Sequence, residues 1–185
     1  MKFKKKHFRV GIVLIGFENN SVIEFLCKRL KELFKNSDCE IAYIQPIPMY
    51  AFNNLRKQYN STKILKDLAI LAKNIDFDRI LGVTNVDLYV PGLNFIFGEA
   101  QFFGKVALIS TSRLKPELYG SYNKSLFFQR ILKEAVHELG HTFGLEHCSN
   151  PKCVMYFSNS IYDTDFKSNN FCSNCKNKLG LLNLG

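Results

Sequence analysis

A stretch near the carboxyl end combines residue types and spacing that suit metal chemistry. His137 and His141 are four positions apart, Glu138 directly follows the first of them, and His147 comes six positions after the second. Four positions make about one helical turn, so both imidazoles would project from one face of a helix toward one metal ion. The alternative is a chance arrangement, which is disfavoured because these three histidines are drawn from a total of four.

Such a set predicts hydrolysis by a zinc-activated water. Three neutral imidazoles leave one position of a tetrahedral zinc ion for water, and the ion lowers that water's pKa to about 7 and polarises a carbonyl. Glu138 is then the candidate general base as the water attacks a peptide bond. We expect Gly144 to end the helix in a left-handed conformation, so that the chain turns back and presents His147 as the third ligand.

A second candidate metal site follows directly. Four of the six cysteines lie between positions 148 and 175, namely Cys148, Cys153, Cys172 and Cys175. Four thiolates form a closed structural zinc site, for which a Cys-x-x-Cys turn is typical. Two disulfides are the alternative, which we disfavour for an intracellular chain. The sequence therefore predicts two zinc ions per chain, one catalytic and one structural.

The two sites are adjacent in sequence. The alpha carbons of His147 and Cys148 are about 3.8 Å apart, so the cysteine-bound zinc would hold the loop that presents the third histidine. We expect it to support activity indirectly. An alternative is that Cys148 occupies the fourth position of the catalytic zinc and gives an inhibited, redox-responsive enzyme. Of the remaining cysteines, Cys27 is expected to be a buried, inert thiol, and Cys39 is assigned no role.

The elements that must position these residues can be read from hydrophobic periodicity. Strands are expected over 9–16, 40–44, 79–84, 95–97 and 106–110, and helices over 21–34, 62–74 and 123–143. This alternation predicts an α/β fold with a mostly parallel sheet. The segment 95–97 is a candidate edge strand, and Ser21 with Glu24 is a candidate capping box.

The helix over 123–143 carries the chemistry. At 100° per residue its apolar residues gather on one side and its polar residues almost opposite, so that the core face and the metal face are separate. The apolar side holds Phe128, Leu132, Ala135, Leu139 and Phe143, and the polar side holds Arg130, Glu134, His137 and His141.

Length and charge set further bounds. The 185 residues fit a single catalytic domain over 1–185 that includes the zinc-binding segment 148–175. The net charge is +9, and its densest run, Lys2 to Lys6, could attract nucleic acid or an anionic membrane. We favour a solvated terminus instead. The apolar run 8–17 is better explained as a first strand than as a signal peptide, and no stretch reaches the roughly 20 apolar residues of a membrane span. We expect a soluble, cytoplasmic protein.

The full motif resembles a known family. His137-Glu-x-x-His-x-x-Gly-x-x-His-Cys-x-x-x-x-Cys-x-Met155, followed by Phe171-Cys172-x-x-Cys175, is similar to the archaemetzincins, and the segments 87–89, 94–98 and 110–114 also look similar. The resemblance implies a compact metzincin-like domain in which a mixed, twisted sheet covers the active-site helix, with a cysteine–zinc subsite near the carboxyl end. It also implies two zinc ions, and it assigns Met155 to the methionine turn beneath the catalytic metal. From the residues alone, Met155 is equally an ordinary core residue.

Two functions from different classes follow from these observations. The first is a zinc metallopeptidase acting on a peptide or protein substrate, which could pair with the edge strand by strand addition. The second is a zinc-stabilised binding module for nucleic acid or protein, with which the charge of +9 is compatible. An open site of three histidines with a glutamate has no purpose in a binding module, so we favour the peptidase and do not expect nucleic acid or a membrane as a partner.

Overall fold

The computed structural model describes residues 7–35 and 37–180. Its main sheet has five strands in the order β2-β1-β5-β8-β7. β1 (Phe8–Ile15), β2 (Ser37–Gln45), β5 (Arg79–Thr84) and β8 (Val106–Ser110) are parallel, and β7 (Gly98–Ala100) is antiparallel to β8. The expected mixed, mostly parallel sheet is therefore confirmed. The amino-terminal lysine run lies outside the described residues.

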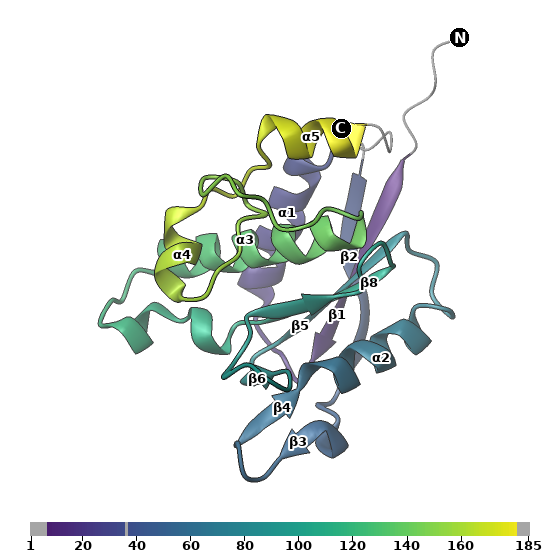
Figure 1. Cartoon of the computed structure of the whole chain (residues 1–185). Helices are drawn as coiled ribbons and strands as arrows, with labels where there is room; N and C mark the ends of the chain where they lie inside the picture. Colours follow the sequence, from purple (N-terminus) through teal and green to yellow (C-terminus); the bar gives the residue numbers. More distant parts are fainter. Residues whose placement is uncertain (1–6, 36, 181–185) are drawn as a thin grey trace.

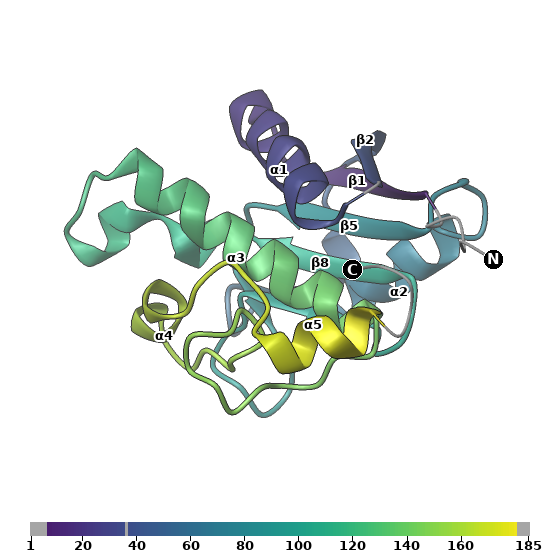
Figure 2. The ribbon, with the colours of Figure 1, turned by 90° about the horizontal axis from the view of Figure 1, so that it is seen from above.

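Helices cover both faces of this sheet. α1 (Asn20–Leu33) and α3 (Lys124–Thr142) lie on one face, and α2 (Ser61–Leu71) lies on the other (Figures 1 and 2). Alternate residues of β1 serve the two sides, because Val10 and Ile12 pack in the cluster with α1 and α3 whereas Val13 and Ile15 pack with α2. A strand buried on both faces reads as a continuous apolar run, which explains the stretch that begins at Phe8.

Shorter elements surround this frame. A small second sheet is formed by β3 (Phe52–Asn53), β4 (Gln58–Asn60) and β6 (Leu88–Tyr89), and 3-10 turns occupy Met49–Ala51, Ser112–Leu114 and Pro116–Tyr119. α4 (Ile161–Phe166) and α5 (Ser173–Gly180) lie beside α3 in both views (Figures 1 and 2). Among the described residues, no helix combines the length and the apolar character that a membrane crossing requires.

The edge strand is displaced from its expected place. The structure has β7 at Gly98–Ala100 rather than at 95–97. Of the expected segment, only the carbonyl of Phe97 extends the ladder of the main sheet, where it accepts a hydrogen bond of 2.8 Å from Ser110 N. Ile96 instead forms an antiparallel bridge with Leu88 of β6 and donates to its carbonyl at 3.0 Å. The prediction followed the strand propensity of the aromatic residues, whose rings do lie with centroids 5.2 Å apart, but the segment pairs at Ile96 with the second sheet and not with the main one.

Two further expectations are corrected around α1. Cys27 and Cys39 form a disulfide that joins α1 to β2, so Cys27 is not an inert free thiol and Cys39 does have a role. The two residues lie on different elements, so the burial expected for each one separately did not indicate that they pair. The helix also begins one residue earlier than expected, and Asn19 caps it by accepting a hydrogen bond from Val22 N, so Ser21 and Glu24 do not form a capping box.

Candidate active site and the adjacent cysteine cluster

The site helix α3 is buried on nearly all sides. Its polar side packs against the segment 164–167 rather than against solvent. Arg130 forms a two-point ion pair with Asp165, with N–O distances of 2.7 Å, and Lys133 Nζ donates to the carbonyls of Thr164 and Asp165 at 2.9 Å. The polar face predicted from the helical period is therefore a second buried face, and these contacts fix the helix on the side away from the sheet.

The carboxyl end of α3 turns the chain back toward the helix. Gly144 has φ of +82° and donates to the carbonyl of His141 at 2.9 Å, while Leu145 N donates to the carbonyl of Gly140 at 3.1 Å. This is the hydrogen-bond pattern of a Schellman motif, which a left-handed glycine permits. The Leu145 carbonyl then accepts a hydrogen bond of 2.7 Å from His141 Nδ1, so one turn both ends the helix and orients a histidine.

The three motif histidines converge. Their nitrogen atoms lie within 4.8 Å of one another. His137 Nδ1 is 2.8 Å from the Val154 carbonyl and His141 Nδ1 is 2.7 Å from the Leu145 carbonyl. Because a carbonyl only accepts, each Nδ1 must carry the proton, which leaves each Nε2 with a free lone pair. These two Nε2 atoms are 3.1 Å apart.

This geometry fits a shared metal ion. Two unprotonated nitrogens at that separation repel one another unless a cation lies between them, and ligands of a tetrahedral zinc ion with bonds of about 2.0 Å are roughly 3.3 Å apart. Burial lowers the pKa of all three histidines, that of His137 well below its usual 6.5, so the rings are held in the neutral form that a metal requires. The nearby positive charge of Lys167 acts in the same direction.

Glu138 lies beside the edge strand. A Cβ atom added to Gly98 would lie 2.6 Å from Glu138 Cγ and 2.7 Å from its Oε1, so only glycine leaves room for the carboxylate at this point. Burial raises the pKa of Glu138 well above 4.5, and the neighbouring Glu134 adds to the effect. Such a shift is typical of a carboxylate that exchanges protons near neutral pH.

Met155 packs directly beneath the site helix. It is fully buried, and a Cβ atom added to Gly140 would lie 2.4 Å from its Sδ. Gly140, the fourth residue of the motif, therefore permits the close approach of the chain that follows the cysteine loop. The residue before Met155 supplies the carbonyl that orients His137, so this turn contacts the site through both a side chain and the backbone.

The histidines open into a cavity of about 590 Å³. Glu134, Glu138 and the three histidines form its floor. Two further parts of the chain form its walls, namely residues 90, 93–100 and 102, which include β7, and residues 157–159. Apolar side chains predominate in these walls: Val90, Leu93, Phe95, Ile96, Phe97, Phe102 and Phe157.

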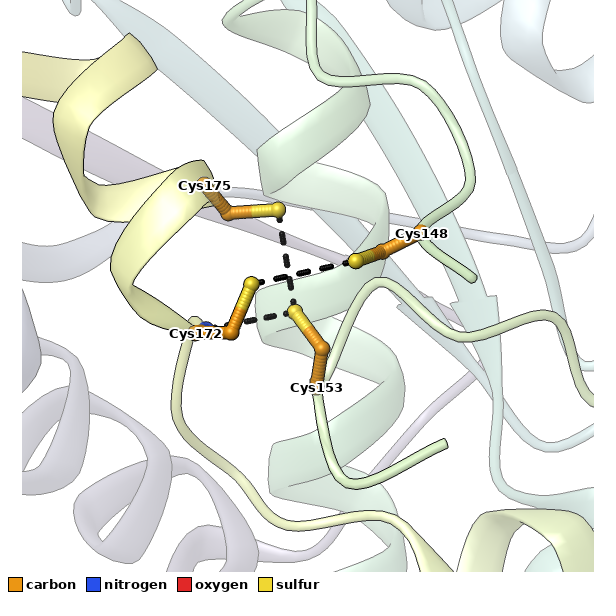
Figure 3. Close-up of side chains that lie close together, drawn as sticks. All are labelled: Cys148, Cys153, Cys172 and Cys175. Carbon is orange, nitrogen blue, oxygen red and sulfur yellow. Dashed lines mark hydrogen bonds between the residues drawn. The ribbon is translucent and has the colours of Figure 1, made fainter. Parts of the chain in front are cut away.

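The four cysteines of the carboxyl-terminal segment form a separate cluster (Figure 3). Cys148 Sγ is 3.8 Å from Cys172 Sγ, and Cys153 Sγ is 3.7 Å from Cys175 Sγ. These distances are too long for disulfides and match the roughly 3.8 Å between thiolates on a tetrahedral zinc ion with bonds of about 2.3 Å. A backbone hydrogen bond from Cys175 lowers the pKa of Cys172 to about 7, and burial raises the pKa of Cys153 and of Cys175.

A backbone hydrogen bond closes the loop that carries both clusters, because Cys148 N donates to the Met155 carbonyl at 2.9 Å. Within the cysteine cluster, Cys172 N donates to Cys153 Sγ at 3.3 Å. The chain from His147 to Met155 thus leaves the histidine cluster, enters the cysteine cluster and returns beneath the site helix. Cys148 lies within the sulfur cluster and not among the residues that line the cavity.

The motif residues that the sequence singled out lie close together, and the segment 95–97, expected to contact substrate, does line the cavity. The sequence did not indicate the roles of Gly98, of residues 90–94 or of the segment 157–159, because these depend on contacts between distant parts of the chain. One signal was present for the first of these, since a glycine that directly follows an aromatic run often marks a close approach.

The chain is similar to known proteins along most of its length. The profile of Peptidase family M54 matches residues 23–180. An archaemetzincin from Methanocaldococcus jannaschii is 49% identical over 172 residues, which cover 92% of each chain. The crystal structure of the Archaeoglobus fulgidus archaemetzincin, complexed with malonate, has a TM-score of 0.80 and 38% identity, and the match covers 92% of this chain and 99% of that one.

A zinc-dependent peptidase from Methanocorpusculum labreanum gives a similar result. Its TM-score is 0.81 at 30% identity, again over 92% of this chain and 99% of that one. The matches extend well beyond the histidine and cysteine motifs and include the sheet that covers the site helix. The chain therefore belongs to Peptidase family M54, the archaemetzincins, and is a zinc metallopeptidase.

Proposed function

We propose that this enzyme cleaves peptide bonds with one zinc ion held by His137, His141 and His147 and with Glu138 as general base. One observation carries the proposal: the three histidines and a buried glutamate line the same open cavity, with two lone pairs already directed at one another. The alternative of a binding module gives this cavity no role.

Each residue then has a defined task. When bound, zinc would acidify a coordinated water and polarise the substrate carbonyl. Glu138 accepts a proton from the attacking water and passes it to the leaving nitrogen, for which its raised pKa suits it. The carbonyls of Val154 and Leu145 keep His137 and His141 in the tautomer that directs Nε2 into the cavity.

The cavity walls favour an extended substrate with apolar side chains. β7 is the outermost strand of the main sheet, and its three residues line the cavity, so a peptide could add to it as a further strand. Phe95, Phe97 and Phe157 would then contact the side chains next to the bond that is cleaved. We therefore infer a preference for peptides with an apolar residue beside the scissile bond.

We further infer a second, structural zinc ion on Cys148, Cys153, Cys172 and Cys175, which makes two ions per chain. The ion would hold the loop that carries His147, through the hydrogen bond from Cys148 N to the Met155 carbonyl. We regard residues 1–185 as one catalytic domain. The four clustered free thiols favour a reducing, cytoplasmic location, whereas the disulfide between Cys27 and Cys39 by itself points to an oxidising one, and we place more weight on the metal-ready cluster.

The direct test compares wild type with Glu138→Ala. The zinc-loaded proteins are each incubated with a peptide library, the products are identified by mass spectrometry, and zinc per chain is counted. We expect wild type to cleave beside apolar residues and Glu138→Ala to lose cleavage by about 10²- to 10⁴-fold while it keeps its zinc. Equal cleavage by the two proteins would refute the role of Glu138.

A further inference from the structure

A fully buried lysine lies close behind the candidate active site. Lys167 directly follows α4, and its side chain has no exposed surface. A buried ammonium group is costly unless it is paired, because it loses its hydration. Lys167 Nζ is 3.0 Å from Glu134 Oε1 and donates to the Tyr156 carbonyl at 3.4 Å. The charge therefore has two partners, one on a side chain and one on the backbone.

These two partners belong to different segments around the cavity. Glu134 lies one helical turn before Glu138 on α3 and forms part of the cavity floor. Tyr156 follows Met155 and directly precedes the wall formed by residues 157–159. The ammonium group thus links the helix that carries the catalytic residues to the segment that leads into residues 157–159 of the cavity lining.

The linked wall contacts the least enclosed histidine. Phe157 packs against His147 with ring centroids 4.8 Å apart. Of the three histidines, His137 is buried, His141 is half-buried and His147 is exposed. The structure gives Nδ1 hydrogen bonds to backbone carbonyls for the first two, and the described contacts of the His147 ring are with Phe157 and the other two rings. Among the three histidines, the orientation of His147 therefore depends most on the position of Phe157.

We propose that Lys167 is a positioning residue that holds Phe157 against His147 by tethering the Tyr156 carbonyl to Glu134. This inference rests on the proposed zinc site. It assigns Lys167 no contact with substrate or with the reacting atoms. Without the tether, the loop at 156–159 is free to shift, and His147 loses the ring that limits its rotation, so the histidine site should bind zinc more weakly.

A second ion pair on the same interface provides a matched control. Asp165 pairs with Arg130, which is buried on α3 one turn before Glu134, at N–O distances of 2.7 Å. Asp165→Asn would leave a buried, uncompensated charge on α3, as Lys167→Met does. Neither Arg130 nor Asp165 is a hydrogen-bond partner of Tyr156 or part of the cavity lining.

The experiment measures zinc affinity in the full chain. Wild type, Lys167→Met, Asp165→Asn and the double variant Glu134→Gln/Lys167→Met are equilibrated in a graded series of zinc buffers, and zinc per chain is counted. A His141→Ala variant identifies the binding step that belongs to the histidine site. The double variant leaves no unpaired buried charge, so it keeps the test valid even where Lys167→Met fails to fold.

We expect the double variant, and Lys167→Met where it folds, to weaken zinc binding at the histidine site by about 10- to 100-fold, the range for residues that support metal ligands. Asp165→Asn should lower the thermal midpoint but leave this affinity within about twofold of wild type. The cysteine step should stay unchanged in all three variants.

Two results would overturn the inference. The first is wild-type affinity in the double variant, which would mean that the tether does not position His147. The second is an equal loss in Asp165→Asn, which would show a general effect of destabilising the interface. Absence of the histidine step in wild type itself would instead refute the proposed zinc site, so the two failures are distinguishable.

Discussion

The histidine cluster and the cysteine cluster begin on adjacent residues, yet their surroundings differ. The histidines offer three neutral nitrogens at the floor of an open cavity, next to a buried carboxylate. The cysteines offer four sulfurs to one another, among a helix and two loops, and line no part of that cavity. Three ligands leave a position for chemistry whereas four close the coordination sphere.

One loop serves both purposes. The turn after α3 presents His147, the cysteine cluster fixes the same chain one residue later, and Met155 brings it back beneath Gly140. Stability and reactivity are thereby assigned to neighbouring residues. The following predictions test this division, beginning with the largest expected effect.

Removal of one thiolate should abolish zinc binding at the cysteine cluster. Cys172→Ser leaves three sulfurs, so we expect loss of the cysteine-bound zinc and a fall in the thermal midpoint of about 10 °C or more, because structural zinc contributes directly to folding. The histidine zinc should bind more weakly as a consequence. Calorimetry and zinc counting measure both effects. Unchanged affinity at the histidine site and unchanged turnover would show that the two sites are not coupled.

A methyl group at Gly98 should damage the histidine site and leave the cysteine site intact. Gly98→Ala places a Cβ atom 2.6 Å from Glu138 Cγ and 2.7 Å from the Leu108 carbonyl, so the carboxylate or the strand must move. We expect kcat to fall by about 100-fold, since small misplacements of a catalytic group have costs of this size. Two zinc ions per chain should remain. Gly180→Ala, where an added Cβ atom meets nothing within 4 Å, is the matched control. Full activity in Gly98→Ala would contradict the packing described for Glu138.

The buried carboxylate should reduce the stability of the metal-free protein. Burial raises the folded-state pKa of Glu138 well above 4.5, so between pH 4.5 and that pKa the folded state binds a proton that the unfolded state does not. Stability contributed by the protonated group is therefore present at acid pH and is lost as pH rises. Metal-free Glu138→Gln should melt about 2 to 4 °C above wild type at pH 7, and the difference should vanish near pH 4.5. A difference that is independent of pH would count against this cause.

The methionine turn should show the smallest effect. Met155→Leu keeps most of the volume beneath Gly140, and swaps of this kind usually cost less than about 1.5 kcal/mol. We expect both zinc ions to be retained and turnover to stay within about threefold of wild type. A loss of zinc from the histidine site in this variant would assign the sulfur atom a role beyond packing.

Much of this division was predictable because it depends on local spacing. The helical period placed His137 and His141 on one face, and the glycine after Phe143 indicated where the helix ends. The parallel strands β1, β5 and β8 were equally clear, since each is a short apolar run between breaks. Contacts between distant segments were not predictable: the disulfide from Cys27 to Cys39, the burial of Lys167 against Glu134, and the three-residue displacement of β7. Aromatic propensity pointed to 95–97, but Ile96 pairs with Leu88 of the second sheet and the strand of the main sheet begins at Gly98.

Stepwise metal removal tests the central claim most directly, namely that the histidine zinc serves chemistry and the cysteine zinc serves the fold. Zinc per chain, peptide cleavage and near-ultraviolet circular dichroism are followed together as a chelator is added to the zinc-loaded enzyme. We predict that the first ion to leave abolishes cleavage and keeps the folded spectrum, and that the second leaves only as the tertiary signal is lost. Cleavage that survives loss of the first ion, or unfolding at that step, would contradict this account.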